Sequence, residues 1–141
     1  MRSGRFYVAW LVSAGIMYFM FYAFHGILTN DIRKVSIPQT VFLSVAGFVY
    51  LILALGLNLL LDAAFFKKEA KSVYTRALIS GPVTAIFLYA VAMVVGISFS
   101  AKFTFFNMLI DLGWQVFEQT VGTLVIAFIK VITFTPDEIE V

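Results

Sequence analysis

The sequence predicts an all-α protein, a four-span transmembrane helical bundle with both termini in the cytoplasm. Of its 141 residues, 62% are hydrophobic and only 13% are charged, which is about half the charged fraction of an ordinary soluble domain. The mean hydropathy is +0.98. Four stretches are each long enough to cross a bilayer core, which takes roughly 20 apolar residues. We therefore expect one integral membrane domain over residues 1–141, with helices at about 6–28, 38–64, 77–99 and 106–134.

The first two spans are the simplest. The 6–28 segment has His25 as its only acidic or basic residue. It is longer than the apolar part of a signal peptide and is followed by no A-x-A-like cleavage site, so we expect it to remain as a helix. Ala9 and Ser13 have the small-xxx-small spacing that favours close helix contact. Pro38 suits the first turn of the second helix, where its missing N–H is not needed.

The third and fourth spans each contain an irregularity. Gly81-Pro82 falls in the first turns of the third helix, and we expect it to bend or loosen the helix there. In the fourth helix the charge-free centre, residues 119–129, is too short to span a bilayer alone. We therefore expect a single tilted helix that carries Glu118 into the membrane. The alternative is that residues 106–118 lie along the interface as an amphipathic helix.

Basic residues predict the orientation. Six lie on the side of the termini and the second loop, and three lie on the other side, so the positive-inside rule places both termini in the cytoplasm. We expect the membrane to be a bacterial inner membrane. The six are Arg2, Arg5, Lys67, Lys68, Lys71 and Arg76, and the three are Arg33, Lys34 and Lys102. The last four of the six are also candidates for holding anionic lipid headgroups, although topology alone explains them.

Polar residues form a stripe along the fourth helix. Their spacing of 4, 4, 3 and 1 positions places them on one helical face. In so apolar a chain, this face must meet protein or water rather than lipid. The residues of this polar stripe are Asn107, Asp111, Gln115, Glu118 and Gln119.

Charged residues in or near a bilayer usually have partners, and the predicted depths suggest two pairs. His25 and Asp111 fall near the outer surface, so they form the first candidate pair. Asp62 and Lys130 fall toward the inside and form the second.

Glu118 is the main candidate for chemistry. A carboxyl group inside a membrane can bind and release a proton, as small proton-coupled transporters require. The plainer explanation, which the sequence favours, is a polar patch that packs against another subunit or forms hydrogen bonds with Gln115 and Gln119.

We expect no cofactor and no metal. His25 could ligate a haem, a chlorophyll or a metal, but there is no second His, and a hydrogen-bonded His at the interface is the commoner case. The chain has no Cys, which excludes thiolate catalysis and Cys-ligated metals. No hydrolase, metalloprotease, nucleotide-binding or dinucleotide-binding motif is present, so we do not expect an enzyme.

Three stretches resemble a family of uncharacterised small bacterial membrane proteins of similar length, described only as a domain of unknown function. They are the end of the first helix (residues 22–31, YAFHGILTND), the small-residue third helix that runs into a short loop, and the opening of the fourth helix (residues 106–114, FNMLIDLGW). The resemblance implies a unit of four membrane spans and says nothing about a substrate.

Two functional classes follow. The first, which the sequence favours, is a non-enzymatic accessory or assembly subunit of a larger membrane complex, because helix surface is abundant and catalytic groups are lacking. The alternative is a small oligomeric proton-coupled transporter or channel that uses the polar stripe. The expected partners are the lipid bilayer and other membrane protein subunits, with a homo-oligomer also open. The net charge of +2 is explained by the loops and does not indicate nucleic acid binding.

Overall fold

The structure, a computed structural model, describes residues 4–30, 32–34, 37–63, 72–97 and 104–132. It is all-α, and four helices are long and apolar enough to cross a membrane, which confirms the predicted fold class. Beside them lie a seven-residue π-helical segment and a short 3-10 turn. The elements are α1 (Gly4–Phe21), η1 (Tyr22–Leu28), η2 (Ile32–Lys34), α2 (Gln39–Asp62), α4 (Val73–Ile97) and α5 (Phe105–Ile132).

The observed helices bear on two of the sequence-based expectations. α4 begins at Val73, before the expected start near residue 77, and it remains helical through Pro82. α5 is one helix of 28 residues, so the described structure has a single long fourth helix and no separate amphipathic segment at 106–118. α2 starts directly after Pro38, whose carbonyl accepts the first helical bond from the Phe42 N–H at 3.0 Å.

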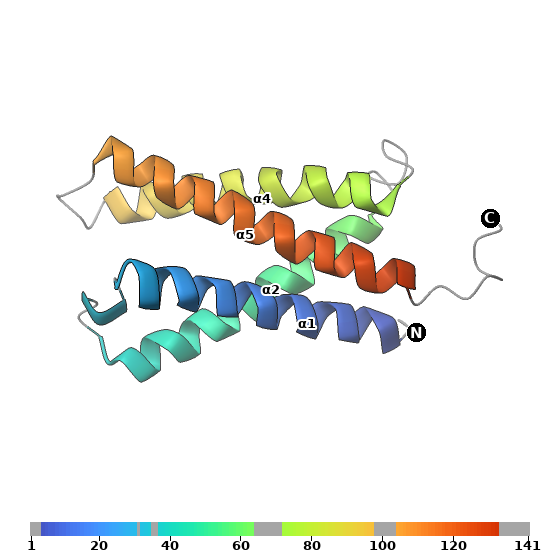
Figure 1. Cartoon of the computed structure of the whole chain (residues 1–141), viewed down its shortest axis with the longest axis horizontal. Helices are drawn as coiled ribbons and strands as arrows, with labels where there is room; N and C mark the ends of the chain where they lie inside the picture. Colours follow the sequence, from blue (N-terminus) through green and yellow to red (C-terminus); the bar gives the residue numbers. More distant parts are fainter. Residues whose placement is uncertain (1–3, 31, 35–36, 64–71, 98–103, 133–141) are drawn as a thin grey trace.

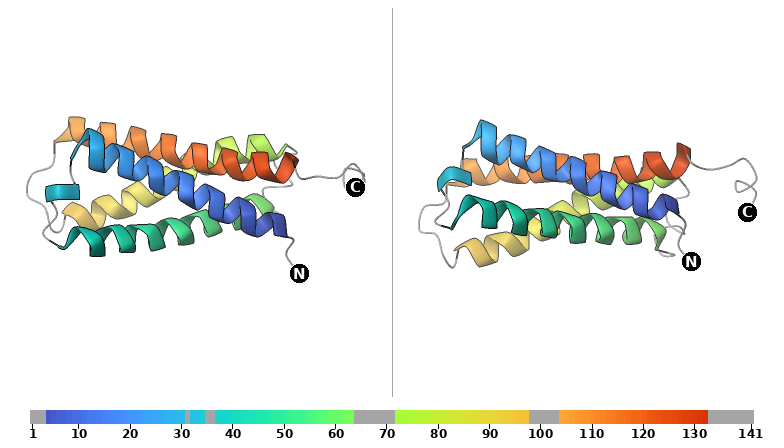
Figure 2. Two further views of the ribbon diagram at one scale, coloured as in Figure 1. Left: turned by 60° about the horizontal axis from the view of Figure 1, so that its bottom comes forward. Right: turned by 90° about the horizontal axis from the view of Figure 1, so that it is seen from below.

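The four helices run side by side as an elongated bundle (Figure 1). α1 begins, α2 ends, α4 begins and α5 ends at one end of the bundle, which we call the terminal end. η1, η2, the start of α2, the end of α4 and the start of α5 lie at the opposite end, which we call the distal end (Figure 2). α5 packs against α4, α1 and α2, and the buried part of its polar stripe, Glu118 and Gln119, lies among these helices.

The buried core lies mostly in the terminal half. Large apolar side chains such as Phe48 and Phe87 instead point outward, at 64% and 66% exposed, as expected of helices surrounded by lipid. The core cluster consists of Ala9, Ala14, Met17, Tyr50, Ala54, Leu57, Leu61, Ala77, Ile126 and Ala127.

Two glycines allow α5 to approach its neighbours closely. A Cβ at Gly81 of α4 would lie 2.7 Å from the Cα of Thr120, and a Cβ at Gly122 of α5 would overlap the side chain of Met17 on α1. The Ser13 hydroxyl of α1 donates to the Gly122 carbonyl at 2.8 Å. Small residues of this kind let helix backbones approach inside a membrane, where packing and interhelical hydrogen bonds replace the hydrophobic effect.

Candidate functional site: a buried carboxyl beside an apolar cavity

Glu118 lies at the centre of the site. α5 carries its side chain into the bundle, where it has no solvent-exposed surface. Two polar groups that act on it are the Tyr50 hydroxyl of α2 and the Trp114 indole N–H, one turn earlier on α5. Neither reaches hydrogen-bond geometry, and among the described residues both carboxyl oxygens are without a hydrogen-bond partner or a basic partner. Burying a carboxyl in this way is costly, and such intramembrane acids are usually functional.

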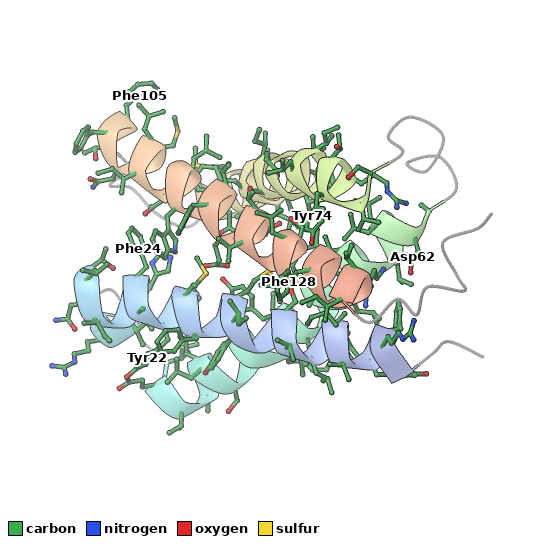
Figure 3. The ribbon with its side chains drawn as sticks, turned by 45° about the vertical axis from the view of Figure 1, so that its right-hand side comes forward. Tyr22, Phe24, Asp62, Tyr74, Phe105 and Phe128 are labelled. Carbon is green, nitrogen blue, oxygen red and sulfur yellow. The ribbon has the colours of Figure 1, made fainter. Side chains whose placement is uncertain are left out.

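The π-helical segment η1 positions one wall of the site. Its wider turn lets the Thr29 N–H donate to the Phe24 carbonyl at 2.9 Å, five residues back. Phe24 is buried and stacks on Trp114, with ring centroids 4.4 Å apart and an interplanar angle of 9°. Figure 3 shows Phe24 reaching from η1 toward α5. π-helical turns are rare and often occur at functional sites, and the sequence analysis did not foresee this one.

A cavity of about 440 Å³ lies in the distal half, between α2 and α4, with the end of α1 and one residue of α5 completing its wall. This volume falls in the range of small-molecule sites. Nine of its lining residues are apolar, and three bring polar groups. The apolar ones are Phe21, Ile37, Phe42, Val45, Ala46, Val49, Leu53, Leu88 and Ala92, and the polar ones are Tyr50, Tyr89 and Gln115.

Tyr50 connects the cavity to the buried carboxyl. Its side chain is part of the cavity wall, and its hydroxyl is one of the two polar groups next to Glu118. Gln115, which also lines the cavity, is three positions before Glu118 and therefore on the same helical face. Glu118 thus lies directly behind the polar part of the cavity wall.

The polar stripe enters the bundle progressively. Asn107 is exposed, Asp111 and Gln115 are half-buried, and Glu118 and Gln119 are completely buried. The stripe therefore begins at the surface of the distal end and finishes inside the protein.

Asp111 and Gln119 have different surroundings. Asp111 lies close enough to the Tyr89 phenol for its charge to act on it, while the Tyr89 hydroxyl donates to the Met108 carbonyl at 3.0 Å. The amide of Gln119 forms no hydrogen bond within the described residues, and neither does the hydroxyl of Ser80. The Thr123 hydroxyl bridges α5 and α4, at 3.0 Å from the Ala77 carbonyl.

Asp62 and Lys130 lie together at the terminal end. Lys130 Nζ is 2.7 Å from Asp62 Oδ1 and 3.3 Å from the Asn58 carbonyl. The Asn58 amide in turn donates to the Phe6 carbonyl at 2.9 Å. This polar cluster therefore joins α1, α2 and α5, and Figure 3 shows Asp62 at this end.

The other candidates lie elsewhere. His25 is half-buried between Phe21 and Phe24, at 5.1 and 5.0 Å between ring centroids, and its pairing with Asp111 remains a prediction. The prediction that Arg76 holds a lipid headgroup is wrong, because Arg76 is only 6% exposed and donates to the Leu61 carbonyl at 2.9 Å. Lys67, Lys68 and Lys71 lie outside the described residues.

No pattern in the sequence pointed to Tyr50, Trp114 or the cavity as parts of the site. The polar stripe pointed to Glu118, but an aromatic residue within an apolar helix gives no signal of which partner it meets. Among the described residues, no three His, Asp or Glu side chains gather in a way that could hold a metal ion.

Comparison with known protein families, with curated proteins and with solved structures finds no match. The family resemblance expected from the sequence is therefore not matched, and what the structure shows is four long apolar helices. The protein is accordingly a small multi-pass membrane protein that contacts the lipid bilayer.

Proposed function

We propose that the protein is a small proton-linked transporter in which the distal cavity holds the substrate and Glu118 carries the proton. The observation that carries this proposal is the position of Tyr50, which lines the cavity and also lies beside the buried Glu118 carboxyl. A proton-binding group next to a substrate chamber is the minimum that coupling requires, because each ligand must alter the binding of the other.

This proposal reverses the order that the sequence alone favoured. An accessory subunit would place the polar stripe against another chain or satisfy it internally. Here Glu118 and Gln119 are inside the protein's own bundle, and their polar side-chain atoms have no hydrogen-bond partner among the described residues. A cavity next to such groups supports a small-molecule role better than a docking role.

In this proposal the protein is not an enzyme. Asp111 and Glu118 are seven positions apart on one helix, about 10.5 Å along the axis, which does not make a catalytic carboxyl pair. If the protein lies in a bacterial inner membrane with both termini on the cytoplasmic side, as the basic loops favour, the cavity lies in the outer half of the bilayer.

The test is proton movement in liposomes. The full chain is reconstituted with a trapped pH-sensitive dye, and a preset pH gradient is challenged with benzyltrimethylammonium, benzenesulfonate or benzamide, an aromatic cation, anion and neutral amide of similar size. We expect one of them to dissipate the gradient with the wild type and not with Glu118→Gln. Asp62→Asn is the matched control, because it makes the same chemical change at the terminal end and leaves the cavity intact.

If none of the three probes gives a response that depends on Glu118, the transport proposal is wrong. Co-purification of the tagged chain with a stoichiometric set of larger membrane proteins would then establish the accessory-subunit function instead.

A further inference from the structure

We infer that the cavity takes an amphipathic organic cation, an aromatic or alkyl body with an amine or quaternary ammonium group, whose binding is coupled to the charge of Glu118. This inference rests on the proposed function, since it names the substrate class of the same site. It follows from three properties of the cavity, which are its aromatic wall, its apolar volume and the sign of the charges around it.

The aromatic wall lies on one side of the cavity. Phe21, at the end of α1, lies 5.4 Å from Tyr50 and 6.2 Å from Phe42, measured between ring centroids, and all three side chains line the cavity. Tyr89 lines it from α4. Aromatic faces attract cations through their ring quadrupole, and clusters of such faces are a common way of binding quaternary ammonium groups.

The charges next to the cavity are negative. Glu118 lies behind Tyr50, and Asp111 lies near Tyr89. None of the lining residues is basic. In an environment of low dielectric constant, a carboxylate acts on a cation strongly even without direct contact, so the hydroxyl of Tyr50 can stand between the two.

Of the described basic residues, Arg5, Arg76 and Lys130 belong to the terminal end. Arg33 and Lys34 belong to η2 at the distal end, where Arg33 is exposed and lies outside the cavity wall. Lys130 is twelve positions beyond Glu118, about 18 Å along the helix axis, and forms the ion pair with Asp62. Arg76 donates to the carbonyl at the end of α2. An organic anion in the cavity would be repelled by the ionised Glu118 behind Tyr50.

The coupling has a definite sign. A cation favours the ionised carboxyl and a proton neutralises it, so cation affinity falls as the pH falls. The titratable group beside Glu118 is Tyr50, on which Tyr18 packs. Around the cavity the others are Tyr89 in its wall, Asp111 next to Tyr89 and His25 against Phe21. His25, whose ring contacts Phe21, is the other group near the cavity that can change its charge in the neutral pH range, so a His25 variant is measured separately.

The experiment measures binding rather than transport. Benzyltrimethylammonium is titrated into the full chain in lipid nanodiscs by calorimetry across a pH series, and its uncharged carbon isostere, neopentylbenzene, is measured by equilibrium partitioning with empty nanodiscs subtracted. The cation should bind at least about tenfold more tightly than the isostere, as attraction to the nearby carboxylate and a cation–π contact would give. Glu118→Gln should abolish this preference and the pH dependence, and His25→Gln should leave both in place.

Two results would overturn the inference. One is equal binding of the cation and the isostere, and the other is a cation affinity that does not change in Glu118→Gln. Because this assay does not involve flux, it separates the two proposals. If a neutral or anionic probe dissipates the pH gradient, the transport proposal holds and the inference of a cationic substrate is wrong. If the cation binds but no flux is seen, the cation inference holds and the transport proposal is wrong.

Discussion

The two halves of the bundle differ in how they are held together. In the terminal half, polar contacts join the helices, from Lys130 to Asp62 and from Asn58 to the Phe6 carbonyl, around completely buried Ala54 and Ala77. In the distal half, aromatic contacts line one side of a cavity of about 440 Å³. A bundle that packs one half tightly keeps its fold while the other half remains free to surround a ligand.

Substitutions of two alanines of α2 test the difference between the two halves most directly. Ala54 is completely buried in the terminal half, whereas Ala46, eight positions earlier, lines the cavity. Ala54→Leu should lower the free energy of unfolding by about 3 kcal/mol, because overpacking forces a close-packed interior apart. Ala46→Leu adds the same atoms where space exists, so its cost should be below about 1 kcal/mol. Equilibrium unfolding in mixed micelles measures both, and equal losses would show that the halves do not differ.

A substitution at the crossing of α4 and α5 should lower the free energy of unfolding slightly less than Ala54→Leu does. Gly81→Ala places a methyl group 2.7 Å from the backbone of Thr120, which a flexible side chain cannot relieve, so we expect a loss of about 2 kcal/mol. Gly113→Ala on α5 has nothing within 4 Å and should be neutral or stabilise by up to about 1 kcal/mol through helix propensity. Thermal unfolding followed by tryptophan fluorescence compares the two, and a stabilising Gly81→Ala would contradict the close approach.

The ion pair of the terminal end should contribute least. The Asp62 side chain is 47% exposed, and pairs of this kind usually contribute about 1 kcal/mol or less. A double-mutant cycle of Asp62→Asn and Lys130→Met should therefore give a coupling energy of about 0.5 kcal/mol. A coupling of several kcal/mol would mean that this pair, rather than the packing around Ala54, holds the terminal half together.

The fold was predictable because it depends on length and hydropathy. Each span is long and apolar enough to cross a bilayer, so the number and type of the helices followed from the sequence. The single helix α5 followed from Glu118, since the charge-free centre could not span alone. Predicted depth also brought Asp62 and Lys130 together, because their levels in the membrane follow from counting residues along each helix.

The site was only half predictable. Periodicity along α5 identified Glu118, since every member of the polar stripe lies on one helix. Tyr50 comes from α2 and Phe24 from a π-helical turn, and their meeting with Glu118 and Trp114 depends on helix rotation and crossing. Those quantities are set by packing at Gly81 and Gly122 rather than by any pattern within one segment. Arg76 shows the same limit, because its loop position suggested lipid headgroups and its packing instead directs it to the Leu61 carbonyl.

The most direct measurement asks whether Glu118 is reached through the cavity. A hydrophobic carbodiimide, which reacts with protonated carboxyl groups in apolar surroundings, is applied to the reconstituted protein, and mass spectrometry locates the modified residue. We predict modification at Glu118 that slows at least about tenfold in Ala46→Phe, where the ring fills the cavity, and keeps its rate in Val41→Phe, an exposed position of α2 outside the cavity wall. An unmodified Glu118, or a rate that Ala46→Phe leaves unchanged, would contradict the account.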